Sequence, residues 1–140
     1  EKRPEIAKRL LKSYERWFED VSSTRPDNYA PPRIVLGTPH ETHTTLSTQD
    51  MRATENGGAW MLRFDNNKTY DIEFLWKEPV ANLSLELQIG SIRKTLNVKT
   101  ATDTTRIRNI KIPNGEAALS VHVPYNNKKQ RPYHIVLIQK

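Results

Sequence analysis

Two histidines and a glutamate lie within four positions, at His40, Glu41 and His43. Imidazole and carboxylate groups bind zinc and act as general bases, so this cluster raises the hypothesis of a metal or catalytic site. The zinc-protease pattern, however, is His-Glu-x-x-His on a helix, which places both imidazoles on one face. Here the two histidines are three positions apart, and Pro39 and four threonines disfavour a helix between positions 37 and 47. We therefore expect no metal site and interpret this stretch as a polar loop.

Asp50 and Glu55 are the acidic residues that could complete a metal site with the histidines.

Other sequence motifs of catalytic or cofactor sites are absent from the chain. The chain has no cysteine, which excludes disulfides, thiolate metal sites and a cysteine nucleophile. It also lacks the Gly-x-Ser-x-Gly elbow and the glycine-rich phosphate loops. Asp71 and Glu73 share a strand face, where we interpret them as solvated surface rather than a catalytic pair. We predict no catalytic residue and no cofactor in this chain.

The formal net charge of +6 is concentrated in the last third of the chain. Residues 1–21 carry +1, residues 22–90 carry −3 and residues 91–140 carry +8. A basic surface of this kind attracts nucleic acid, anionic lipid or sulfated glycan, and it also serves solubility alone. No run of 18 apolar residues is present, so we expect no membrane span.

The first expected element is an amphipathic helix over residues 4–22. Its apolar side chains recur at helical spacing. They are Ile6, Leu10, Leu11, Tyr14, Trp17, Phe18 and Val21. We take Tyr14, Trp17 and Phe18 as candidates for a domain interface, because such a stripe needs a partner surface. That partner is either the sheet of this same chain or another domain.

Residues 23–57 read as a proline-rich connector with one short strand at 33–37. From residue 58 onward the apolar period becomes two, which is typical of strands with one buried face. Gly90-Ser91 predicts a tight hairpin, and the stretch at 65–68 is interpreted as a second hairpin turn. Seven or eight such strands predict a mainly β chain, in which the helix precedes an antiparallel, jelly-roll-like β-sandwich over residues 58–140.

Candidate contact residues lie outside the strands, because the strand aromatics fall in the apolar phase and are expected in the core. Tyr29 and Tyr125 lie in loops and are the better candidates for stacking on a sugar. Lys128, with its neighbour Lys129, and Arg131 form a candidate anion clamp. The burial of most aromatics also disfavours nucleic-acid binding, which needs exposed rings interleaved with basic residues.

Several short patterns follow one another in order between residues 4 and 76. A Tyr-x-x-Trp helix precedes an isoleucine–glycine strand, a Thr-Leu-Ser-x-x-Asp stretch, a tryptophan and a Tyr-Asp-Ile strand. The residues are Tyr14 and Trp17; Ile34 and Gly37; Thr45, Leu46, Ser47 and Asp50; Trp60; and Tyr70, Asp71 and Ile72. In this order they resemble the C-terminal region of bacterial arylsulfatase-type sulfatases.

This resemblance implies an accessory domain of an enzyme that hydrolyses sulfate esters, with the helix packed on a preceding catalytic domain. It implies a formylglycine, made from a Cys/Ser-x-Pro-x-Arg motif, and a calcium ion in that other domain, and a periplasmic or secreted parent. The motif does not occur here, since "SSTRP" at 22–26 does not fit it. His40, in the connector, then becomes a candidate for substrate contact together with Tyr125, Lys128 and Arg131. The alternative from the residues alone is a free-standing carbohydrate-binding β-sandwich.

Overall fold

The computed structural model describes residues 3–23, 32–55, 57–124 and 131–140 of the 140-residue chain. Contacts divide the chain into two units, Glu1–Pro32 and Arg33–Lys140. The first unit contains one helix and the second contains the strands. Among the described residues, no helix has the length and apolar character needed to cross a membrane.

The helix α1 spans Pro4–Ser23, which confirms the predicted amphipathic element. Pro4 suits the first turn because a backbone donor there would have no helical partner. Glu5 adds an acidic side chain at the same end, where the helix dipole favours it. At the other end, the Ser22 and Ser23 hydroxyls donate to backbone carbonyls three residues earlier, which satisfies groups in the last turn.

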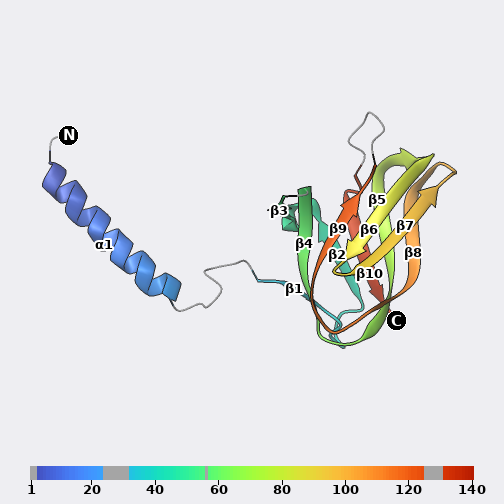
Figure 1. Ribbon diagram of the computed structural model, residues 1–140, viewed down its shortest axis with the longest axis horizontal. Coiled ribbons are helices and arrows are strands. Elements are labelled where there is room, and N and C mark those ends of the chain that lie inside the picture. The colour runs from blue at the N-terminus through green and yellow to red at the C-terminus, as the bar shows by residue number, and fades with distance from the viewer. Residues whose placement is uncertain (1–2, 24–31, 56, 125–130) are drawn as a thin grey trace. The chain divides into compact units, whose positions relative to one another are not determined.

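The described residues of the second unit form ten strands and one short 3-10 helix, η1. The elements are β1 (Ile34–Leu36), β2 (His43–Ser47), η1 (Thr48–Asp50), β3 (Arg52–Thr54), β4 (Gly57–Phe64), β5 (Lys68–Val80), β6 (Leu83–Ile89), β7 (Ile92–Val98), β8 (Thr102–Ile112), β9 (Gly115–His122) and β10 (His134–Gln139). One sheet has the order β1-β4-β9-β6-β7, with β3 paired to β4, and the other has the order β2-β10-β5-β8. Every pair is antiparallel except β1 with β4. The two sheets pack as the predicted sandwich (Figure 1).

The core lies between the two sheets and contains the predicted apolar phase of each strand. Leu85, Leu87 and Ile89 of β6 are buried, as are the four alternating aromatic and aliphatic residues of β5. Those four are Tyr70, Ile72, Phe74 and Trp76. Alternation of this kind buries one face of each strand, so it identifies the core without identifying the partner strands.

The tight hairpin at Gly90-Ser91 is confirmed, because β6 and β7 pair directly with Ile89 opposite Ile92. Gly90 has φ +56°, a conformation that glycine adopts without strain. The hairpin expected at 65–68 is wrong, because β4 and β5 lie in different sheets. Both strands bury alternate residues in the same core. A strand shows this alternation whether the next strand pairs with it in a hairpin or lies in the facing sheet, so the sequence could not distinguish the two.

The connector expected at 23–57 contributes more than one strand. Residues 33–54 provide β1, β2 and β3, and β2 pairs along its whole length with β10. Gly37, at the end of β1, has φ +89°, and a Cβ there would lie 3.3 Å from the Tyr70 hydroxyl. The carbonyl of Gly37 accepts a hydrogen bond from the Asn66 side chain at 3.0 Å. The backbone conformation therefore favours glycine at this bend, and a larger residue would also make tight contacts with Tyr70.

Asp71 is only 5% exposed, which corrects the interpretation of this residue as solvated surface. It lies at a register shift between β5 and β8, where Asn109 adopts φ +58°. The Asp71 carboxylate accepts a hydrogen bond from the Asn109 amide at 2.9 Å and lies 3.0 Å from Lys140 Nζ. Glu73, the other member of the supposed pair, forms an ion pair with Arg106 instead. These carboxylates hold strands together, which is a structural role.

The hydrogen bond from the Asn109 amide lowers the pKa of Asp71; burial opposes this shift, and Lys140 adds to it. A carboxyl whose folded pKa is lowered stabilises the fold above its unfolded pKa of about 3.9, and this contribution is lost as pH falls through the folded pKa. We expect Asp71→Asn to lower the melting temperature at pH 7, and this difference from the native chain should shrink as the pH falls below about 4. Melting curves by circular dichroism across pH measure it.

Glu78→Gln is the matched control, because Glu78 is exposed on the same strand and the charge change is identical. A melting-temperature difference for Asp71→Asn that stays constant down to pH 2 would contradict the assigned role.

Candidate functional site

The apolar face of α1 is exposed, and three aromatic side chains form its centre. Tyr14, Trp17 and Phe18 are 56%, 60% and 52% exposed, and none of the helix side chains is buried. The Tyr14 ring lies 5.8 Å from that of Trp17 and 6.1 Å from that of Phe18, as expected for positions three and four apart on a helix. We call these three residues the aromatic stripe. Leu10, Leu11 and Val21 extend it along the helix.

Contiguous exposed apolar patches mark interaction surfaces in soluble proteins. Within the first unit, the helix has no buried residue, so its large apolar side chains are available to a partner surface. The aromatic stripe therefore remains a candidate domain interface.

The loop with the two histidines leads into β2 and exposes its ionisable side chains. His40 and Glu41 are exposed, and His43 begins β2 with its Nδ1 3.0 Å from the Thr42 hydroxyl. Among the described residues, no group of three His, Cys, Asp or Glu side chains is placed to hold a metal ion. The calcium implied by the sulfatase resemblance therefore has no ligand set in this part of the chain.

The end of the same loop is a capping motif. Ser47 and Asp50 form a capping box around η1, and the Ser47 amide donates to the Asp50 carboxylate at 2.9 Å. This hydrogen bond and that of the Ser47 hydroxyl lower the pKa of Asp50. The Ser47 carbonyl accepts the indole N–H of Trp60 at 2.6 Å, which ties the loop to β4. Asp50, considered above as a metal ligand, is thus engaged in ordering the loop.

The predicted substrate contacts are not brought together in the described part of the chain. His40 lies in an exposed turn, and Arg131 is exposed just before β10, beside Gly57. No hydrogen bond or ion pair joins His40 to Arg131. Tyr29, Tyr125, Lys128 and Lys129 lie outside the described residues.

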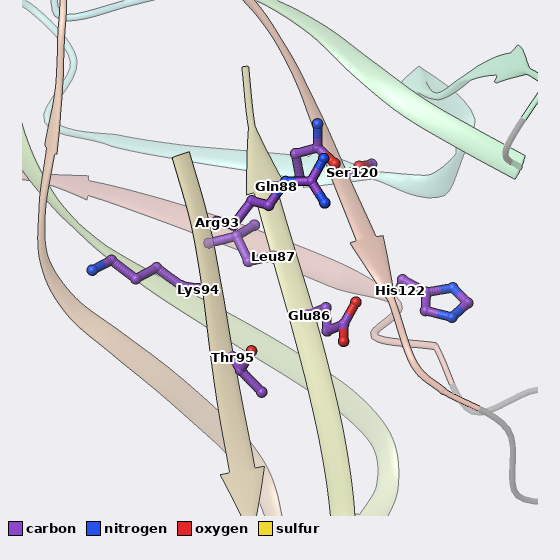
Figure 2. A pocket seen from close by; sticks show the side chains of 8 residues that line it. All are labelled: Glu86, Leu87, Gln88, Arg93, Lys94, Thr95, Ser120 and His122. Atoms are coloured by element: carbon purple, nitrogen blue, oxygen red, sulfur yellow. The ribbon is translucent and has the colours of Figure 1, made fainter. Parts of the chain in front are cut away.

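A shallow depression lies on the outer face of the sheet formed by β7, β6 and β9. Its volume is about 200 Å³, and Figure 2 shows the side chains that line it. Strand register arranges six of them in two rows, each with one residue from each strand. The first row is Arg93, Gln88 and Ser120, and the second is Thr95, Glu86 and His122. We call these six residues the polar face.

Most polar groups of this face are free to bind a ligand. Gln88 donates to the Gly90 carbonyl at 3.1 Å. Within the described part of the chain, the side chains of Arg93, Glu86 and His122 form no hydrogen bond or ion pair with another residue. Arg93 in the first row and Glu86 in the second carry opposite charges, so the face presents a cation at one end and an anion at the other.

Sequence reasoning identified part of this face without recognising it as a site. The alternation of β6 predicted that Glu86 and Gln88 face away from the core, and His122 was expected to face outward. The sequence did not show which strands lie beside β6. Its neighbour β9 begins more than 20 positions later, after the chain has passed through β8 of the opposite sheet.

No family model matches the chain, and the searches of curated proteins and of solved structures found no match. The sulfatase resemblance therefore remains a prediction from the sequence. The fold, the aromatic stripe and the polar face are derived from the structure.

Proposed function

We propose that this chain is a non-catalytic accessory domain of a sulfatase, an enzyme that hydrolyses sulfate esters. Its partner is the catalytic domain of the same polypeptide, which would hold the formylglycine and the calcium ion. The domain has a structural role there and shapes one wall of the substrate pocket. In this proposal the parent is periplasmic or secreted.

The exposed aromatic stripe is the observation that carries this proposal. A helix that presents three large rings and buries none of its side chains suits a surface that another domain covers. The order of the sequence patterns between residues 4 and 76 supports a sulfatase domain in particular.

The DNA that encodes the residues before Glu1 provides the first test. It should encode a Cys/Ser-x-Pro-x-Arg motif within an α/β domain. The second test is complementation, in which that domain is produced separately and mixed with residues 1–140. We expect a stable complex with higher sulfatase activity than the upstream domain alone. An upstream sequence without the motif would refute the proposal.

A free-standing carbohydrate-binding module is the second candidate, favoured by the depression on the polar face. It predicts saturable glycan binding without any partner domain. Loss of that binding on changing Tyr29 or Tyr125 to alanine would support the loop-tyrosine version of this candidate.

We expect the isolated chain to show no turnover of 4-nitrophenyl sulfate, because it lacks the Cys/Ser-x-Pro-x-Arg motif from which the formylglycine is made. The measurement is release of 4-nitrophenol by purified protein of verified mass, with added calcium. This expectation would be contradicted if 4-nitrophenol were released faster than in buffer alone and if this activity co-purified with the chain.

A further inference from the structure

We propose that the polar face binds a pyranose sugar that carries an anionic substituent, a sulfate or a carboxylate. The six residues of this face are Glu86, Gln88, Arg93, Thr95, Ser120 and His122. Three neighbouring strands, β7, β6 and β9, position them in the two rows described above.

The size of the face fits one or two sugar rings. Neighbouring strands lie about 4.8 Å apart, so three strands span about 10 Å. Residues two positions apart on one strand are separated by about 7 Å, which is the distance between the two rows. Ser120 and His122 on β9, like Glu86 and Gln88 on β6, have this separation.

The first row provides hydrogen-bond donors for an anion. The Arg93 guanidinium presents a planar, permanently charged fork that pairs with a carboxylate or sulfate through two parallel hydrogen bonds. Gln88, directly opposite on β6, contributes an amide, and Ser120 on β9 contributes a hydroxyl. Figure 2 shows Arg93 and Gln88 on adjacent strands at this end of the depression, with Ser120 beyond them.

The second row provides an acceptor, and this determines the class of ligand. The Glu86 carboxylate only accepts hydrogen bonds when ionised, and it repels a second negative charge. Its ideal partner is therefore a hydroxyl donor in the second row, whose backbone positions lie about 7 Å from those of the first row. Thr95 and His122 flank Glu86 and can bond further hydroxyls. A sugar with one anionic substituent meets both requirements.

Two other ligand classes fit this face less well. A nucleic acid would place phosphates along the whole face, including over Glu86, and the six residues include no Trp, Tyr or Phe on which a base would stack. An inorganic anion would use Arg93 and leave the second row unused. The pairing of a donor row with an acceptor row is what favours a sugar.

The test is a titration of ¹⁵N-labelled residues 1–140 followed by amide chemical shifts. The probes are glucose 6-sulfate, glucuronic acid, glucose and inorganic sulfate. We expect saturable shifts on β6, β7 and β9 with the first two probes, and weaker binding of glucose and of inorganic sulfate. Arg93→Gln should weaken the binding of glucose 6-sulfate about tenfold, the usual effect of losing a charged hydrogen bond.

Two further variants distinguish a site from general attraction to a basic protein. Arg108→Gln is the matched control, because Arg108 is exposed on β8 in the opposite sheet and the charge change is the same. It should leave binding unchanged. Glu86→Gln should weaken the binding of glucose 6-sulfate but not that of inorganic sulfate, since only the sugar has a hydroxyl for this carboxylate.

The proposal is overturned by any of three results. These are no saturable shifts on the three strands, equal affinity for inorganic sulfate and for glucose 6-sulfate, or an equal loss in Arg108→Gln and Arg93→Gln. The proposal does not depend on the sulfatase assignment. An upstream gene sequence without a formylglycine motif would remove that assignment and leave this binding unaffected.

Discussion

Replacing Trp17 and Phe18 together by glutamate is expected to weaken strongly the complex between this chain and the proposed catalytic domain. Each aromatic side chain offers about 150–250 Å² of surface, of which roughly half is exposed on α1. Covering about 200 Å² of apolar area in total contributes roughly 5 kcal/mol at about 25 cal/mol/Å². The dissociation constant should therefore rise on the order of a thousandfold. Surface plasmon resonance with the separately produced upstream domain measures it.

The matched control is Lys12→Gln with Arg16→Gln. Both residues lie on the opposite side of α1 from Tyr14, and this pair changes the net charge by the same two units. We expect the control to bind like the native chain. Equal loss of binding in both double variants would contradict a specific role of the aromatic stripe. The melting temperature of the sandwich should remain unchanged in both, since α1 belongs to a separate unit.

Trp60→Ala is expected to cause the largest loss of stability in the sandwich. The Trp60 side chain is only 3% exposed in the core, and its indole N–H donates to the Ser47 carbonyl at 2.6 Å. Removing a buried tryptophan costs about 3–5 kcal/mol, out of a typical total of about 5–15 kcal/mol. The melting temperature should fall on the order of 15 °C, as measured by far-ultraviolet circular dichroism.

Two variants separate packing from hydrogen bonding in this prediction. Trp60→Phe keeps most of the buried ring but loses the indole N–H. The loss of this hydrogen bond should lower the free energy of unfolding by about 1–2 kcal/mol, in addition to the loss from the smaller buried side chain. Trp17→Ala removes an exposed tryptophan from α1 and should change stability by less than about 0.5 kcal/mol. A loss for Trp60→Ala no larger than that for Trp17→Ala would contradict the role assigned to Trp60.

Much of the fold follows from patterns within single elements. The apolar spacing of residues 4–22 predicted α1 to within one residue, because a helix brings positions three and four apart onto one face. The alternation from Leu83 to Ile89 predicted both the extent of β6 and its buried face. Gly90 predicted the hairpin to β7, because its backbone conformation is local to the turn.

Contacts between distant elements were not predictable in the same way. Asp71 has the outward phase of β5, yet the register shift opposite Asn109 buries it beside Lys140. Residues 33–54 have too few alternating positions to indicate three strands. These strands are defined by their partners, since β1 and β3 pair with β4 and β2 pairs with β10. Local patterns contain no information about such partners.

The sequence by itself determined the helix and its aromatic stripe, the mainly β class and the identity of most core residues. Each of these depends on the periodicity of side chains along one element. Only the tertiary structure decided which strands are neighbours, and so placed Arg93, Gln88 and Ser120 in one row and Glu86 beside His122 in the next. The physical reason is that register between strands arises from packing of the whole sandwich, which joins segments that are far apart in the chain.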